Sequence, residues 1–309
     1  MFKYYLYRFA RFLVNRLSLA TSYRLGIILS DIQYVFSFRD RRAVHNNLMR
    51  ILPARPPEAE LSAMTRQVFR NFGKYLVEFL RMDGMVDKDF IARRVKIENI
   101  ERIDRALEKG KGAIIMTAHI GNWELGAVLL NMLGYQLMAV ALPHKERPVN
   151  DLFNHQREVH GITVVATNNA IRKCMEHLKS NKIIAIVGDR DFTVKGGELI
   201  DFFGVKALIP KGTATFSKKT GAPILPTFLI REPDNTFRLS ILEPMFPPKD
   251  ADEEGVPEEE AIRRIMRRYL TVIEDQIRRY PAQWLLFREF AVSSVSSVSS
   301  VSGEAGGIR

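Results

Sequence analysis

His119 and Glu124 lie five positions apart in the segment TAHIGNWELGA and are the residues best suited to catalysis. A histidine can remove a proton from an attacking hydroxyl, while a nearby carboxylate orients the ring and stabilises the imidazolium that forms. No serine or cysteine nucleophile is needed if the acceptor hydroxyl attacks an activated ester directly. The alternative is structural, a histidine that caps a loop.

The setting of this pair favours the catalytic interpretation. The apolar run AIIMT before it predicts a buried strand, and WELGAVLLNML after it predicts a helix that ends at Gly134. Sites in open α/β sheets gather beyond the carboxyl ends of strands. Gly121 permits a tight connection, and a helix start offers N–H groups and a positive dipole end to a developing oxyanion.

The rest of the chain predicts an α/β fold in which a mixed, largely parallel central sheet is flanked by helices. Strands are expected at the apolar runs LMAVAL, ITVV, IIAIVG and ILPTFLI, and at TFRLSIL, which we place at the sheet edge. Helical spacing of apolar residues predicts helices after PPEAE, around residues 150–159 and 169–179, and from Pro257 onwards. Residues 46–290 form one domain in this interpretation.

Residues 1–45 are expected to form a basic and aromatic helical segment associated with a membrane. The first 24 residues contain five Lys and Arg residues among aromatic and aliphatic side chains, and no acid. This mixture suits a helix in the headgroup region, although a basic helix packed on the domain is the alternative. Arginines interrupt any stretch long enough for a signal peptide or a spanning helix. Residues 291–309, which repeat Val-Ser-Ser, predict a disordered tail.

The formal net charge of +11 predicts a polyanionic partner: nucleic acid, anionic lipid or an acidic carrier protein. The arginines of the last predicted helix either face solvent or dock an acidic partner. The single cysteine, Cys174, excludes an internal disulfide and is expected in the core. The histidines show no metal-ligand spacing with acids or cysteine, so no metal site is predicted.

Several motifs in order resemble the bacterial lipid A biosynthesis acyltransferase family, which includes lauroyl and myristoyl transferases and the related phosphatidylinositol mannoside acyltransferases. They are AHIGNWELGA, with its His-x-x-x-x-Glu block, and then RPVNDLFNHQREVHGITVV, GDRDF, IDFFG, IPKGTATFSKKTGAPILPTFLIR and PAQWLLF. The resemblance covers nearly all of the chain to about residue 290. It implies a fold like that of the glycerolipid acyltransferases.

The resemblance also implies roles for particular residues. His119 is the base and Glu124 its partner, while Arg157, Asn122, Asp189 and Asp191 are expected to bind substrate. Plain structural roles are the alternatives, with Arg157 on a helix face and the two aspartates capping a helix or pairing with Arg190. The acyl donor is a thioester of acyl carrier protein or coenzyme A, and no cofactor or metal is required. Lipid A transferases are expected to have Asp-Gln-Asp where this chain has Asp-Arg-Asp, which is closer to the phosphatidylinositol mannoside branch.

The leading hypothesis is therefore an acyltransferase at the cytoplasmic face of the bacterial inner membrane, peripheral or monotopic. It would acylate a hydroxyl of a lipid A precursor or related anionic glycolipid, with an acidic acyl carrier protein as partner and without nucleic acid. The first alternative acceptor is a phosphatidylinositol mannoside, a lysophospholipid or an aminolipid. A different class of function is a non-catalytic basic protein that binds membrane or nucleic acid. The acyl chain length, the hydroxyl and the oligomeric state leave no signal in the sequence.

Overall fold

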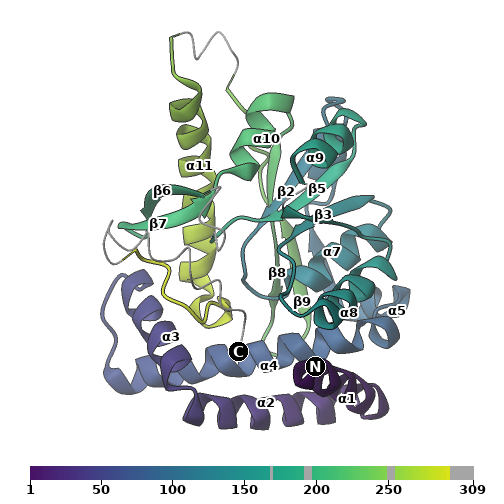
Figure 1. Ribbon diagram of the computed structural model, residues 1–309, viewed down its shortest axis with the longest axis vertical. Helices are drawn as coiled ribbons and strands as arrows, with labels where there is room; N and C mark the ends of the chain where they lie inside the picture. Colours follow the sequence, from purple (N-terminus) through teal and green to yellow (C-terminus); the bar gives the residue numbers. More distant parts are fainter. Residues whose placement is uncertain (168–169, 191–196, 249–254, 293–309) are drawn as a thin grey trace.

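A computed structural model describes residues 1–167, 170–190, 197–248 and 255–292 of the chain. Four helices come first: α1 (Phe2–Arg16), α2 (Leu19–Phe36), α3 (Phe38–Ile51) and α4 (Glu58–Met85). Helices α1 and α2 pack along the long helix α4, and the three lie together at one end of the molecule (Figure 1). The boundary expected at residue 45 falls inside α3.

The centre of the molecule is a seven-stranded sheet in the order β1-β9-β8-β2-β5-β3-β4. The strands are β1 (Val95–Glu98), β2 (Ala113–Thr117), β3 (Leu137–Ala141), β4 (Thr163–Ala166), β5 (Ile183–Val187), β8 (Ile224–Arg231) and β9 (Phe237–Ile241). Neighbouring strands are parallel except β8 and β9, which run antiparallel. The predicted α/β architecture with a largely parallel sheet is therefore confirmed.

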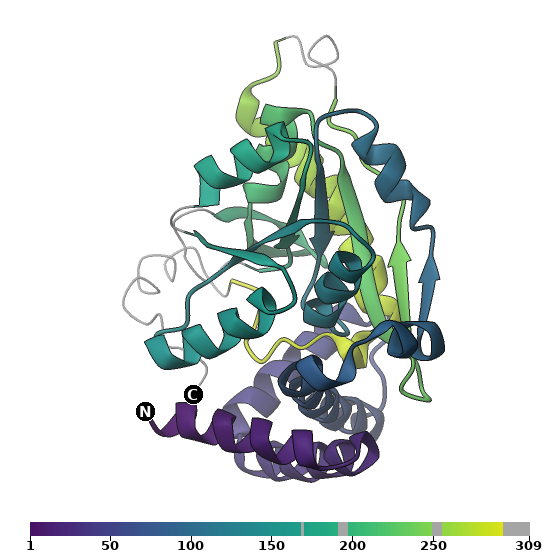
Figure 2. The same ribbon diagram turned by 90° about the vertical axis from the view of Figure 1, so that its right-hand side faces the viewer.

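Helices cover both faces of this sheet (Figure 2). They are α5 (Lys88–Arg94), α6 (Glu101–Leu107), α7 (Trp123–Met132), α8 (Arg147–Glu158), α9 (Ala170–Lys179), α10 (Gly212–Thr220) and α11 (Glu258–Arg279), followed by the short 3-10 helix η3 (Pro281–Gln283). Side chains of β2 alternate between two cores, because successive residues of a strand point to opposite faces. Ile114 belongs to the core that contains buried side chains of α9, α10 and α11, whereas Ile115 belongs to the core that contains those of α6, α7 and α8.

Two features of the sheet differ from expectation. The segment TFRLSIL, expected at the edge, forms β9 and is covered on its outer side by the short strand β1, which pairs with it from Val95 to Glu98. A separate antiparallel pair, β6 (Gly197–Phe202) and β7 (Val205–Pro210), was not predicted. Its strands, GELIDF and VKALIP, contain apolar runs of only two and three residues and do not alternate strictly between polar and apolar residues, so neither pattern marked them as strands.

The amino-terminal helices expose many large apolar side chains. On α1 these include Phe2, which is 80% exposed, and on α2 they include Phe36, which is 75% exposed. Within the described ranges, no helix has both the length and the apolar character needed to cross a bilayer. The predicted tail, residues 291–309, lies outside the described residues from position 293 onwards.

Candidate active site

His119 and Asp189 lie at the same edge of the sheet because they follow two paired parallel strands. Strand β2 ends at Thr117 and strand β5 at Val187, and these two residues are partners in the ladder. His119 and Asp189 each stand two positions further on. Gly121 turns the chain after His119 with φ of +62°, and a Cβ there would lie 2.0 Å from the carbonyl oxygen of Leu229. The site therefore occupies the carboxyl edge expected for an open α/β sheet.

The ring of His119 is held by the carboxylate of Asp189. Nδ1 of His119 lies 2.6 Å from Oδ1 of Asp189, and the backbone N–H of His119 donates to the same oxygen across 3.2 Å. The indole Nε1–H of Trp284 donates to Oδ2 across 2.9 Å. An ionised carboxylate can only accept a hydrogen bond, so Nδ1 of the neutral ring must carry the proton and donate it to Asp189. The unprotonated Nε2 then presents its lone pair. That is the tautomer required of a general base.

Burial keeps this histidine neutral in its resting state. Burial lowers the pKa of His119, and the charge of Arg190 lowers it further, while Asp189 and Glu124 act in the opposite direction. Burial alone would raise the pKa of Asp189, but His119, Arg190 and the indole of Trp284 outweigh it and hold that pKa well below its usual range. The pair is therefore a neutral imidazole beside an ionised carboxylate.

Glu124 makes its hydrogen bonds with Arg157, whereas the sequence predicted that it would orient His119. Nε and one terminal nitrogen of the Arg157 guanidinium donate to the two carboxylate oxygens across 2.9 and 2.6 Å. Glu124 lies in the first turn of α7 and Arg157 in the last turn of α8, so the pair joins these two helices. Burial would raise the pKa of Glu124, but Arg157, with smaller contributions from Trp123 and His119, outweighs it and lowers the value. Glu124 thus acts on His119 through its charge.

Asn122, expected to bind substrate, has both ends of its side chain engaged within the protein. Its Oδ1 accepts from the backbone N–H of Leu125 across 3.0 Å and so caps α7, while its Nδ2 donates to Oε2 of Glu78 across 2.7 Å. Asn122 is completely buried. It therefore positions the start of the helix that carries Glu124.

Glu78 is a positioning residue that sequence reasoning missed. Its carboxylate is completely buried and accepts hydrogen bonds from the guanidinium of Arg231 and from the hydroxyl of Tyr23. These partners come from β8 and α2, and Glu78 itself from α4. The available signal was an acid inside the apolar stretch YLVEFL, since a buried carboxylate requires a partner.

Trp284 is the second residue to which sequence reasoning gave no role, although it lies in the motif PAQWLLF. The segment that contains it follows η3 and runs antiparallel to the loop after β2, with Ile120 opposite Trp284. Leu285 donates its N–H to the carbonyl of His119 across 2.8 Å, and Gly121 donates to the carbonyl of Gln283 across 3.0 Å. This segment therefore fixes the backbone on both sides of His119.

Comparison of the sequence with known proteins shows the family of this chain. The profile of the family described as bacterial lipid A biosynthesis acyltransferase matches residues 2–290. The chain belongs to this family. The resemblance of the motifs is thereby confirmed, and the family name describes acyltransferases.

Individual relatives are 24 to 30% identical to this acyltransferase-family chain over the residues that align. A phosphatidylinositol mannoside acyltransferase of Mycobacterium tuberculosis (strain CDC 1551) is 30% identical over 190 residues, 60% of this chain and 59% of the relative. The Escherichia coli lipid A biosynthesis lauroyltransferase is 24% identical over 245 residues, 78% of each chain. A Haemophilus influenzae lipid A biosynthesis acyltransferase is 26% identical over 142 residues, 46% of this chain and 44% of the relative. The match thus spans about three fifths of the mycobacterial relative.

The remaining predicted residues are placed as follows. Asp191 lies outside the described residues. Cys174 is buried in the core, where burial raises the pKa of its thiol to about 11, so it is no nucleophile at neutral pH. In the described part of the chain, no three His, Cys, Asp or Glu side chains come together as metal ligands.

Proposed function

We propose that this member of the lipid A acyltransferase family transfers a fatty acyl chain from a thioester to a hydroxyl of an anionic glycolipid. The observation that carries the proposal is the His119–Asp189 pair, a neutral imidazole fixed at Nδ1 at the carboxyl edge of a parallel sheet. A hydroxyl acceptor needs such a base, because it becomes a strong nucleophile only as its proton is removed.

The proposed reaction is a direct transfer without an acyl-enzyme. Nε2 of His119 takes the proton of the acceptor hydroxyl while its oxygen attacks the thioester carbonyl carbon. The tetrahedral intermediate then expels the thiolate, the C–S bond breaks, and the imidazolium returns its proton to the sulfur. An oxygen ester and a free thiol result. Asp189 stabilises the imidazolium through Nδ1–H, and the charge of Glu124 favours the same protonated form.

The thioester donor is proposed to be acyl carrier protein or coenzyme A. The acceptor is proposed to be a lipid A precursor or a related glycolipid. Two observations favour a phosphatidylinositol mannoside as a second candidate acceptor. The chain has Asp189-Arg190-Asp191 where lipid A transferases are expected to have Asp-Gln-Asp, and the mycobacterial mannoside acyltransferase shares 30% identity with it.

The amino-terminal helices are proposed to hold the enzyme peripherally on the cytoplasmic face of the bacterial inner membrane. Exposed large apolar side chains gather on α1 and α2: Phe2, Tyr5, Leu6, Phe9, Phe12, Ile28, Leu29, Ile32, Val35 and Phe36. Basic residues interleave with those of α1, as they do in helices that lie in the headgroup region. The reaction would then take place where its lipid acceptor resides.

A product analysis tests the proposed function. The purified protein receives labelled acyl carrier protein or acyl coenzyme A together with a lipid A precursor, a phosphatidylinositol mannoside or a neutral diglycosyl lipid at equal concentration. Mass spectrometry should find an acylated anionic lipid that His119→Ala does not form. Lipid binding without any acylated product would favour the non-catalytic binding protein, and preference for the neutral lipid would overturn the anionic acceptor.

A further inference from the structure

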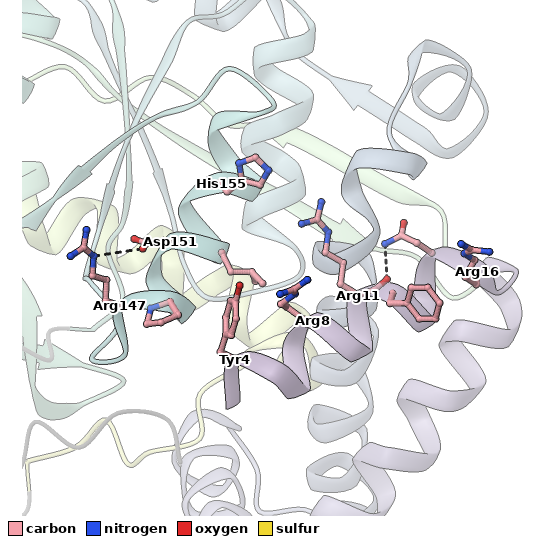
Figure 3. Close-up of a pocket in the computed structure, with 11 residues that line it drawn as sticks. Tyr4, Arg8, Arg11, Arg16, Arg147, Asp151 and His155 are labelled. Carbon is pink, nitrogen blue, oxygen red and sulfur yellow. Dashed lines mark hydrogen bonds and ion pairs between the residues drawn. The ribbon is translucent and has the colours of Figure 1, made fainter. Parts of the chain in front are cut away.

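A groove lies between α1 and α8, and none of the residues that line it belongs to the candidate active site. The groove has a volume of about 720 Å³ and is open to solvent. Tyr4, Arg8 and Arg11 line it from α1, and Arg147 and His155 line it from α8 (Figure 3). Two helices that lie far apart in the sequence therefore build one concave and basic surface.

The groove carries an excess of positive charge. It is lined by four arginines, Arg8, Arg11, Arg16 and Arg147, and by one acid, Asp151. Arg147 pairs with Asp151 across 3.8 Å, but both side chains are largely exposed, so the pair is weak. Arg11 pairs with Asp83. The positive charge available to a ligand therefore belongs to Arg8, Arg16 and the weakly paired Arg147.

Arg8 and Arg16 contact aromatic rings in place of carboxylates. The guanidinium of Arg8 lies 5.7 Å from the centre of the Tyr4 ring, and that of Arg16 lies 5.2 Å from the Phe12 ring. No ion pair of either side chain appears among the described residues. Stacking on a ring restrains a guanidinium while leaving its N–H groups free to bind an anion.

The groove borders the exposed apolar side chains of α1. Phe12 belongs to both surfaces, since it lines the groove and is 58% exposed. Phe9 is 63% exposed on the same helix, one residue after Arg8. A ligand in the groove would meet cationic groups beside apolar side chains, which is the chemistry of a lipid headgroup at the edge of the hydrocarbon layer.

We propose that this groove binds the phosphate headgroup of an anionic membrane lipid, with Arg8, Arg16 and Arg147 as its cationic ligands. The proposal rests on the membrane attachment proposed above and adds a defined headgroup site to it. Guanidinium groups bind phosphate oxygens through paired hydrogen bonds. An acidic carrier protein is the less suitable occupant, because exposed apolar residues such as Phe9 beside the groove match acyl chains better than a charged protein surface.

Vesicle binding tests the proposal with a charge-matched control. The full-length protein and the double variant Arg8→Gln/Arg147→Gln are sedimented with vesicles of phosphatidylcholine alone or mixed with phosphatidylglycerol. The control is Arg24→Gln/Arg39→Gln, which removes two exposed arginines from α2 and α3 that do not line the groove. The groove variant should lose about fivefold in affinity for the mixed vesicles per arginine removed. The control should lose clearly less.

The outcomes separate a headgroup site from its alternatives. Equal losses in the two double variants would mean diffuse attraction and would overturn the groove. The headgroup proposal would also be overturned if the groove variant bound vesicles normally but bound acyl carrier protein more weakly than the unmodified protein does. The readout does not depend on acyl transfer, since His119→Ala should bind vesicles like the unmodified protein. If the protein transfers no acyl group but the groove variant still loses vesicle binding, the proposed function is contradicted and the headgroup site is not. If the unmodified protein binds none of the vesicles, the proposed membrane attachment and the headgroup site are both contradicted.

Discussion

Asn122 donates a hydrogen bond to Glu78 across 2.7 Å, which connects the loop after His119 to a carboxylate on the long helix α4. The same carboxylate pairs with Arg231 of β8 and accepts from Tyr23 of α2. The start of α7 is thereby fixed against both the sheet and the amino-terminal helices. Because Glu124 belongs to the first turn of α7, this network also determines where the second carboxylate of the site stands.

Glu78→Gln should destabilise the protein strongly. It would leave Arg231 buried without its counter-charge, which costs about 3 to 5 kcal/mol in the free energy of unfolding. Urea unfolding followed by circular dichroism measures the loss. The double variant Glu78→Gln/Arg231→Met should recover part of it, because both charges are then removed. A single variant as stable as the unmodified protein would contradict the role of the pair.

His119→Ala should lower acyl transfer by several orders of magnitude, since the ring is the group positioned to take the acceptor proton. Asp189→Asn should lower kcat by about a thousandfold or more, because an amide no longer selects the tautomer with its proton on Nδ1. Turnover is measured with saturating lipid and thioester, and circular dichroism checks that the fold is intact. Near-normal turnover in either variant would exclude the proposed general base.

The pH profile of kcat/KM should report the lowered pKa of His119. The neutral ring is the active form, so activity should rise with pH through that pKa, and the midpoint should lie below the usual histidine value of 6.5. The carboxylate of Asp189 raises the pKa of His119, so the residual activity of Asp189→Asn should have its midpoint lower still. A midpoint above 6.5 in the unmodified protein would show that burial does not control this histidine.

Arg157→Lys should reduce kcat more than it changes KM. A lysine cannot form both hydrogen bonds to Glu124, and losing one charged hydrogen bond lowers the rate by about tenfold to a hundredfold. Arg172→Lys, an exposed change on α9, is the control. In a Glu124→Gln background the Arg157 change should add little, because the two side chains act as one unit. A raised KM with unchanged kcat would instead indicate that Arg157 contacts substrate.

The strands of the central sheet could be predicted where they are continuous apolar runs, as in β2, β5 and β8. Both faces of these strands are buried, so nearly every position is apolar. The pair β6 and β7 gave no such signal, and β1 is four residues long. His119 and Glu124 were singled out by type and setting. Their hydrogen-bond partners, Asp189 and Arg157, were expected at the site as substrate-binding residues and not as partners of these two side chains. The contact of His119 with Asp189 joins residues separated by 70 positions.

The contact of His119 with Asp189 could have been suspected from the predicted strands, although the separation of the two residues in the sequence does not indicate it. Two strands expected in one parallel sheet each end two residues before a polar side chain, His119 and Asp189. Parallel strands bring such residues to one edge, but the order of the strands decides which of them meet. The sequence does not state that β5 lies beside β2. The prediction therefore chose Glu124, five positions after His119, as the carboxylate that orients the ring.

The hydrogen bond from Trp284 to Asp189 has a consequence for the timing of assembly. The two residues are 95 positions apart, and Leu285 also pairs with the backbone of His119. A nascent chain that has emerged from the ribosome only as far as β9 can form the strands around His119 but still lacks Trp284 and Leu285. Contacts between distant residues also slow folding. Catalytic competence should therefore arise late in synthesis, after the sheet exists.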